Sequence, residues 1–169
     1  DGPPPDFLKT AEPFGKIHST FGTFFASGNH EEFTDSSPMW NALRQAGVHV
    51  LNNELTTVDG LQIIGVNYNS TTRADSQKQI LDSLHVKKDT ASIMVKHAPS
   101  LIPVAENAGV SLQLSGHTHV GQVYPMVYFT KMVFGKFYYG LNKLNTIQVL
   151  TTSGVGTWGP PQRVGTNGE

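Results

Sequence analysis

Three apolar runs of this chain each end in a polar cluster that contains histidine. In layered α/β folds, ligands collect just outside the ends of the strands, so clusters of this kind indicate a shared pocket. A histidine at one strand end, taken alone, is more often a capped or solvated side chain, and the interpretation depends on all three clusters together. The clusters are Gly28-Asn29-His30-Glu31, Lys96-His97-Ala98-Pro99 and Gly116-His117-Thr118-His119.

The third cluster places two histidines on alternate residues. In an extended segment, His117 and His119 would project to the same face, and in a turn they can still converge on one metal or on two adjacent ones. Gly116 gives the backbone the freedom to make such a turn. With His97 and Asn29 the set comprises three imidazoles and one amide oxygen, which suits Zn, Fe or Mn better than Ca or Mg.

The composition limits the other classes of function. Of the 169 residues, 38% are hydrophobic and 15% are charged, as in an ordinary globular domain. The net charge of −1 gives no signature of nucleic-acid binding. Because the chain has no cysteine, disulfides and thiolate metal sites are excluded. No run approaches the roughly 20 apolar residues of a membrane span.

Strand and helix patterns alternate along the chain, which predicts an α/β fold in one domain, residues 1–169. The Asp59-Gly60 turn between 55–58 and 61–66 predicts a β-hairpin. A helix should begin at Ser36-Ser37-Pro38 and end at Gly47. Further strands are expected at 20–26, 48–51, 91–95, 111–114 and 146–152, and further helices within 6–17, 73–84 and 102–108.

Residues 120–139 are rich in aromatic residues and methionine, with Lys131 and Lys136 as their charges. We expect this stretch to be a loop or hairpin that covers the core. The alternative is an apolar flap beside the metals, in contact with a lipid or membrane surface. The glycine-rich residues 153–159 are expected to be a turn rather than a phosphate cradle.

In order and spacing, the three clusters resemble the third, fourth and fifth motifs of the calcineurin-like metallophosphoesterases, written G-N-H-[DE], H and G-H-x-H. The resemblance covers nearly the whole chain. It implies the family's fold, a sandwich of two mixed β-sheets flanked by helices, with the metals at the strand ends. It also implies that a metal-bridging hydroxide hydrolyses a phosphoester, with monoester, diester and pyrophosphate substrates left open.

Carried over by position, the resemblance assigns a role to each residue of the set. Asn29, His97 and His117 would bind the second metal, and His119 would bind the first. His30 would be the catalytic residue that is not a ligand, donating a hydrogen bond to the phosphate and a proton to the leaving group. The implied cofactor is two divalent or trivalent ions, Mn, Fe or Zn.

The family's early D-x-H and G-D motifs, which supply carboxylates to the metals, do not occur in this sequence. The resemblance therefore implies an incomplete domain that needs a missing N-terminal segment and is inactive alone. Residues 1–5 are expected to lie within a loop, and Asp1 is not assigned as a ligand, because the family's G-D arrangement would put the bridging aspartate just before it. A non-catalytic binding or scaffold domain and an inactive fragment stay open as alternatives. The compartment is also open, with membrane association through segments outside this chain as one alternative.

Overall fold

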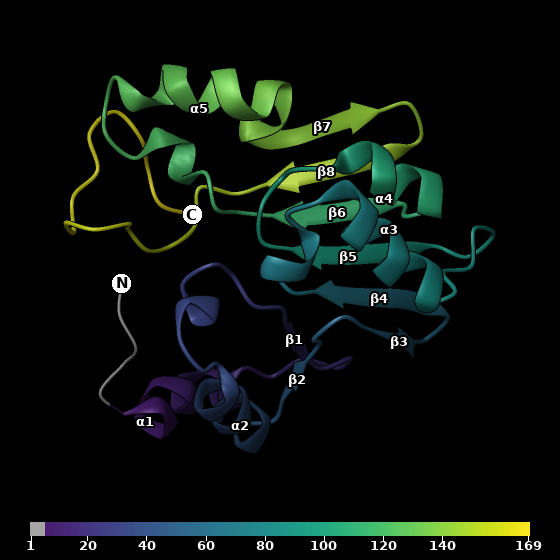
Figure 1. Ribbon diagram of the computed structural model, residues 1–169. Coiled ribbons are helices and arrows are strands. Elements are labelled where there is room, and N and C mark those ends of the chain that lie inside the picture. Colours follow the sequence, from purple (N-terminus) through teal and green to yellow (C-terminus); the bar gives the residue numbers. More distant parts are fainter. Residues whose placement is uncertain (1–5) are drawn as a thin grey trace.

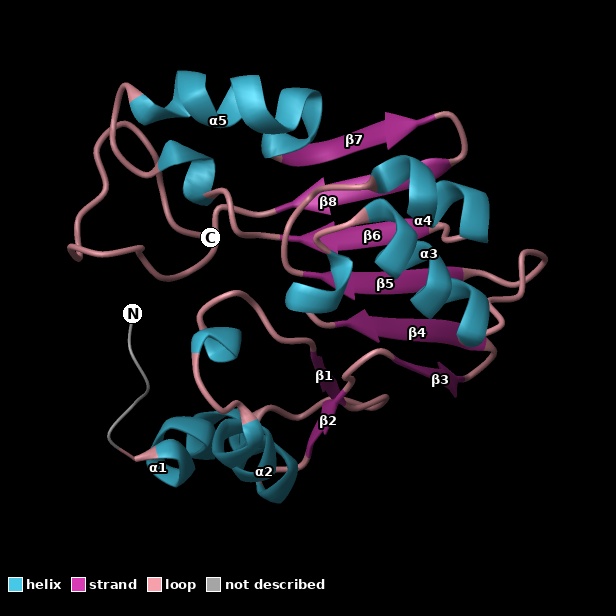
Figure 2. Cartoon of the chain, in the orientation of Figure 1, coloured by secondary structure: helices cyan, strands magenta, loops and turns pink. Residues whose placement is uncertain are grey.

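A six-stranded mixed sheet and a two-stranded parallel sheet form the framework of the chain (Figure 1). The computed structural model describes residues 6–169, and the loop expected over residues 1–5 lies outside them. Helices flank both sheets (Figure 2). The expected α/β class, with two sheets flanked by helices, is therefore confirmed.

The large sheet directs four strand ends to one edge. Its order is β3-β4-β5-β6-β8-β7, in which β4, β5, β6 and β8 run parallel and the outer strands β3 and β7 run antiparallel to their neighbours. The carboxyl ends of the four parallel strands therefore open on the same side, at the left in Figure 1. The strands are β3 (Glu54–Val58), β4 (Leu61–Val66), β5 (Ser92–Lys96), β6 (Leu112–Ser115), β7 (Gly140–Leu144) and β8 (Ile147–Thr151).

Two helices, α3 (Ala74–Ser83) and α4 (Ile102–Ala108), cover one face of this sheet (Figure 2). Leu81 of α3 and Ala105 of α4 are buried against Met94 in the centre of the sheet. The helix α4 ends at Gly109, whose φ of 92° is the left-handed conformation that commonly terminates helices. The main hydrophobic core thus lies between these helices and the parallel strands.

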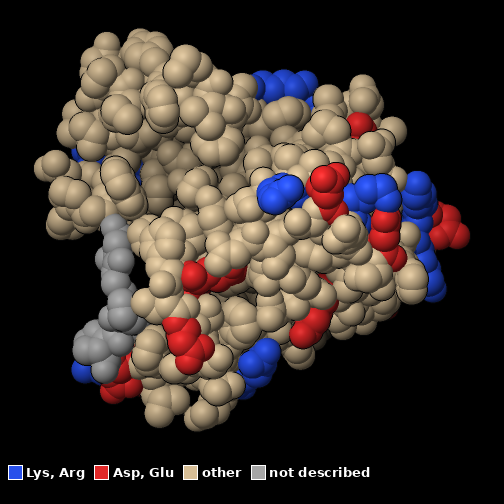
Figure 3. All heavy atoms as spheres, viewed as in Figure 1, with Lys and Arg blue, Asp and Glu red and all other residues tan. Residues whose placement is uncertain are grey.

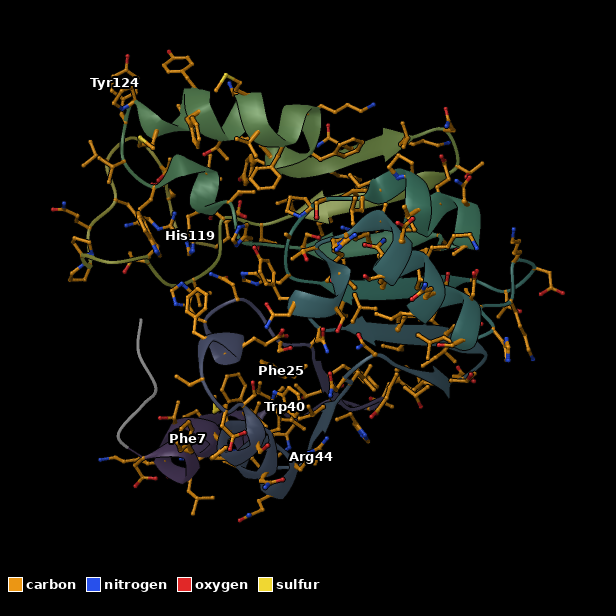
Figure 4. The ribbon with its side chains drawn as sticks, in the orientation of Figure 1. Phe7, Phe25, Trp40, Arg44, His119 and Tyr124 are labelled. Carbon is orange, nitrogen blue, oxygen red and sulfur yellow. The ribbon has the colours of Figure 1, made fainter. Side chains whose placement is uncertain are left out.

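A smaller lobe surrounds the strands β1 (Thr23–Phe25) and β2 (Val48–Val50). Figure 4 shows Phe7, Phe25 and Trp40 gathered where the helices α1 (Phe7–Ala11) and α2 (Ser37–Gln45) meet β1. Short 3-10 helices complete the fold at η1 (Glu12–Lys16), η2 (Glu31–Phe33), η3 (Asn69–Thr71), η4 (His119–Gly121) and η5 (Gly135–Tyr138).

The two lobes meet where Leu51, after β2, packs on Gly65 of β4. A Cβ at Gly65 would lie 2.2 Å from the Cβ of Leu51, so only glycine permits this approach. Leu51 N also donates to the carbonyl oxygen of Phe25 at 2.9 Å, so the same residue connects the end of β1 to the large sheet.

The prediction of a loop or hairpin over residues 120–139 is wrong. Residues Met126–Phe134 form the helix α5, which lies beyond the edge strand β7 in the view of Figure 1 and contacts η4 and η5. An apolar run shows no clear period, so it cannot distinguish a helix from a hairpin. The strand β7 was also missed. The other predicted strands and helices are confirmed, with bounds that differ by a few residues.

Glu106 joins α4 to the turn between β7 and β8. Its carboxylate accepts hydrogen bonds from Thr146 N at 2.7 Å and Ile147 N at 3.3 Å, and from Asn145 Nδ2 at 3.0 Å. The backbone hydrogen bond from Thr146 is the largest cause that lowers the pKa of Glu106 from 4.5 to about 2. One ionised side chain therefore ties α4 to the turn between β7 and β8.

The substitution Glu106→Gln should lower the melting temperature at pH 7, because the amide accepts these bonds less strongly. Since the folded-state pKa of Glu106 is depressed, its stabilisation is present above about pH 4.5 and is lost as the pH falls toward 2. The difference in melting temperature between parent and variant should narrow over that range. Glu54→Gln, at an exposed position on β3, is the control. A difference that is independent of pH would contradict the assignment.

Candidate metal centre

A cavity of about 310 Å³ lies at the edge where the parallel strands end. Its lining contains all five residues that the sequence analysis selected, although their roles stay predictions at this point. The opposite wall is apolar and comes largely from α5, through Met126 and Phe129. The five selected residues are Asn29, His30, His97, His117 and His119.

The ends of neighbouring strands position the first two imidazoles. His97 directly follows β5, and His117 follows β6 after one glycine. The strands stay aligned beyond their last residues, because Gly116 N donates to the carbonyl oxygen of His97 at 2.9 Å. The His117 Nδ1 and His97 Nε2 atoms consequently lie 3.1 Å apart.

The third imidazole belongs to a turn, not to an extended segment. His117 and His119 have φ angles of 67° and 46°, in the left-handed region that residues other than glycine seldom adopt. Thr118 stabilises this turn, because its hydroxyl donates to the carbonyl oxygen of Tyr138 at 2.8 Å. The spacing of His117 and His119 in the sequence therefore does not explain why they converge. Their convergence depends on two unusual backbone conformations. Figure 4 shows His119 between the α5 layer and the lower lobe.

Two glutamates shape the loop that carries Asn29 and His30, and neither lines the cavity. Glu31 Oε2 accepts a hydrogen bond from Gly28 N at 2.7 Å, which closes the turn around the two residues between them. The Glu32 carboxylate accepts from the backbone N–H of Tyr68 at 2.8 Å. The segment after β1 is thereby attached to the segment after β4.

Sequence reasoning did not select Tyr68, whose ring lies close to two of the histidines. Its centroid is 5.8 Å from that of His97 and 5.7 Å from that of His117. Tyr68 follows the end of β4, so the rule that placed the histidines at strand ends would have found it as well.

Arg163 supports the turn that carries His119, a role that the sequence analysis did not assign. Its Nη1 donates to the carbonyl oxygen of His119 at 3.1 Å, and its Nη2 donates to that of Ser153 at 2.8 Å and that of Gly156 at 2.6 Å. The guanidinium therefore connects the glycine-rich segment after β8 to the His119 turn.

Burial keeps the imidazoles neutral. It is the largest cause that lowers the pKa of His97 from 6.5 to about 4, and the neighbouring His117 and His119 lower it further. The pKa values of His117 and His119 are also lowered, again mainly by burial. Neutral imidazoles have the free nitrogen lone pair that a metal ion requires.

The donor set fits part of a metal centre. Asn29 Oδ1 and His119 Nδ1 are buried without a hydrogen-bond partner among the described residues, as is His30 Nδ1. Buried polar atoms without partners are uncommon, and coordination to an ion would satisfy a ligand atom. Within residues 6–169, however, no three His, Asp or Glu side chains are arranged to hold an ion by themselves. The described residues therefore supply an incomplete set of ligands.

Curated relatives of the chain are metallophosphoesterases by name. An uncharacterized metallophosphoesterase of Helicobacter pylori (strain J99) is 34% identical over 156 residues, which cover 89% of this chain and 42% of that protein. One of Campylobacter jejuni is 31% identical over 170 residues, which cover 97% of this chain and 45% of the relative. A transmembrane protein with metallophosphoesterase domain of Danio rerio is 27% identical over 181 residues, 94% of this chain and 40% of that protein.

These relatives confirm the resemblance to the calcineurin-like metallophosphoesterases. The chain spans less than half the length of each of the three. No protein-family model matches the chain, and no solved structure matches it.

Substitution of Gly28 should displace the His97 ring. A Cβ at Gly28 would lie 2.8 Å from His97 Cε1 and Nδ1, closer than carbon atoms pack. We expect Gly28→Ala to lower the affinity of the chain for Zn²⁺ about 10–100-fold, as loss of a supporting contact does at other metal sites. Gly156→Ala is the matched control, because a Cβ there would have no atom within 4 Å. Unchanged Zn²⁺ affinity and unchanged His97 ring signals in NMR spectra of Gly28→Ala would disprove the packing role.

The metal-free chain should lose stability as the pH falls from about 6.5 to 4. The folded-state pKa of His97 lies below its ordinary value, so the unfolded chain binds the proton first. His97 alone should account for a loss of about 3 kcal/mol in the free energy of unfolding. Chemical denaturation at several pH values, with a chelator present, measures this loss.

His97→Asn should remove much of this pH dependence, and His18→Asn, at an exposed position, should preserve it. If the free energy of unfolding falls equally with pH in the parent chain and in His97→Asn, a group other than His97 takes up the proton.

Proposed function

We propose that this chain is part of a hydrolase that cleaves phosphoesters with two divalent or trivalent metal ions, Mn, Fe or Zn. The observation that supports this most is the meeting of five side chains from three separate segments in one cavity, where two of the expected ligand atoms are buried and unpaired. The relatives' names support it too, since they contain the word metallophosphoesterase. Because the chain spans less than half of these relatives, the activity of the whole protein is part of the proposal.

Asn29, His97, His117 and His119 would hold the ions. Their donors are one neutral amide oxygen and three imidazole nitrogens, a set that suits Zn, Fe or Mn. Since no described side chains complete a site by themselves, we propose that carboxylates outside residues 6–169 supply the other ligands. When bound, the ions would polarise the phosphoryl oxygens and make a water molecule acidic enough to attack near neutral pH.

His30 would supply the proton for the leaving group. It lines the cavity, and the ring of Phe33 packs edge-on against it with a centroid separation of 5.2 Å. An imidazole held in this way can donate a hydrogen bond to a phosphoryl oxygen and then a proton to the departing oxygen.

The rest of the lining favours an anionic substrate. No Asp or Glu belongs to the cavity lining in the described part of the chain, because Glu31 and Glu32 are engaged by backbone N–H groups. The opposite wall presents the apolar side chains of Met126 and Phe129. A phosphate group therefore meets neutral donors on one wall and an apolar surface on the other.

The decisive comparison is between His30→Ala and His119→Ala in the metal-loaded protein. We expect His30→Ala to lower turnover about 10²–10⁴-fold, the usual contribution of a general acid, with the metal content unchanged. His119→Ala should lose metal as well as turnover. His85→Ala, at an exposed position after α3, is the control. Aryl phosphate monoesters and diesters as substrates, with metal analysis by mass spectrometry, measure both quantities.

Loss of metal in His30→Ala would make His30 a ligand and end its assignment as the acid. If the metal-loaded protein hydrolyses no phosphoester, the proposed function fails and the non-catalytic scaffold becomes the better account.

A further inference from the structure

The helix α5 directs its apolar side chains to solvent. Thr130, a polar residue, is its buried position at 7% exposure, whereas Met132 is 74% exposed and Tyr128 is 61% exposed. Helices on the surface of a globular domain normally show the opposite arrangement, with the apolar stripe toward the core. We call these exposed residues of α5 and of the turn before it the α5 face: Tyr124, Met126, Tyr128, Phe129, Met132 and Val133.

The part of the chain around α5 carries positive charge only. No Asp or Glu occurs between Glu106 and Glu169, whereas Lys131, Lys136 and Lys143 occur in this stretch together with Arg163. Lys131 lies within α5 itself, and Lys136 lies in η5, two residues after the end of α5, where its exposed ammonium also donates to the carbonyl oxygen of Lys143 at 2.6 Å. In Figure 3 the end of the molecule formed by α5 and the adjoining loops shows no acidic atoms, which gather over the lower and right-hand parts.

The α5 face continues to the mouth of the metal cavity. Met126 and Phe129 belong both to the face and to the cavity lining. Trp158, which is 61% exposed, also lines the cavity. A surface against which this face rests would therefore lie beside the histidine cluster. Figure 4 shows Tyr124 at the outer end of α5.

We propose that the α5 face is a docking surface for a lipid bilayer that contains anionic phospholipids. Methionine, phenylalanine and valine side chains at the centre of the face suit the region just below the headgroups. Tyrosine and lysine around them have apolar bodies and polar tips, which suit the headgroup layer. None of the helices in residues 6–169 has the length and apolar character to span a bilayer, so the contact is interfacial.

The charge distribution favours a bilayer over a second copy of the chain. A second copy that docked through the same face would bring the same lysines into opposition, and like charges repel. An anionic lipid surface instead attracts each lysine near it, which increases the binding constant about fivefold per residue at low ionic strength. No acidic residue of this stretch opposes the attraction, and the nearby Glu169 carboxylate accepts hydrogen bonds from the Tyr139 hydroxyl and from Ser153 N.

Co-sedimentation of the metal-free chain with vesicles tests the proposal without any measurement of turnover. We expect binding to vesicles of equal parts phosphatidylcholine and phosphatidylglycerol, weaker binding to phosphatidylcholine alone, and a decline with added salt. Lys131→Gln and Lys136→Gln should each weaken binding about fivefold. The double variant Tyr128→Ser, Met132→Ser, outside the cavity lining, should weaken binding to both kinds of vesicle.

Matched controls come from the rest of the surface. Lys87→Gln and Lys88→Gln remove exposed positive charges far along the chain from α5, and Phe21→Ser removes an aromatic side chain that is 57% exposed. All three should bind vesicles as the parent chain does. Melting temperatures identify a variant that has unfolded. If the double serine variant has unfolded, Lys131→Gln and Lys136→Gln decide whether the proposal holds.

Three outcomes would overturn the proposal. The first is no binding to the anionic vesicles, and the second is equal loss of binding in the control variants. The third is a lipid-free dimer, seen by analytical ultracentrifugation, that Met132→Ser dissociates, because a second copy would then cover the α5 face. Since none of these measurements involves metal or substrate, a failed activity assay leaves the result intact.

Discussion

The imidazole of His97 packs against the backbone of Gly28 so closely that a single methyl group cannot be inserted between them. This contact joins the segment after β1 to the end of β5, two parts of the chain about 70 residues apart. The same ring also contacts His117 through their nitrogens and packs against the ring of Tyr68. The position of His97 thereby determines where the other groups of the cavity can lie.

Charged side chains around the site act mainly on the backbone. Glu31 and Glu32 accept hydrogen bonds from N–H groups of two loops, and Arg163 donates to carbonyl oxygens of two others. Charge-assisted hydrogen bonds of this kind are stronger than neutral ones, so they can hold loops that have little regular structure. Because the carboxylates of Glu31 and Glu32 bind backbone N–H groups outside the cavity, the cavity is lined by neutral donors.

The two walls of the cavity differ in polarity because they come from different elements of the fold. One wall consists of polar residues that follow the ends of β1, β5 and β6, and the other is formed mainly by apolar residues, Met126 and Phe129 of α5 together with Trp158. The parallel strands deliver polar loops to a single edge, whereas α5 approaches that edge from beyond the sheet with its apolar side chains uncovered.

The sequence by itself determined the features that depend on neighbouring residues. The Asp59-Gly60 turn predicted the hairpin of β3 and β4, Ser36-Ser37-Pro38 and Gly47 marked the bounds of α2, and three polar clusters after apolar runs marked the edge of the sheet. These signals are local, because turn chemistry and helix termination involve residues a few positions apart.

Only the tertiary structure decided which of the distant groups meet. The contact of Tyr68 with His97 and the attachment of Glu32 to the segment after β4 have no trace in any single stretch of sequence. The sequence also left the direction of α5 open, because an apolar run is compatible both with a buried element and with side chains that face solvent. Contacts of this kind depend on strand order and on the packing of whole elements, which join residues far apart in the chain.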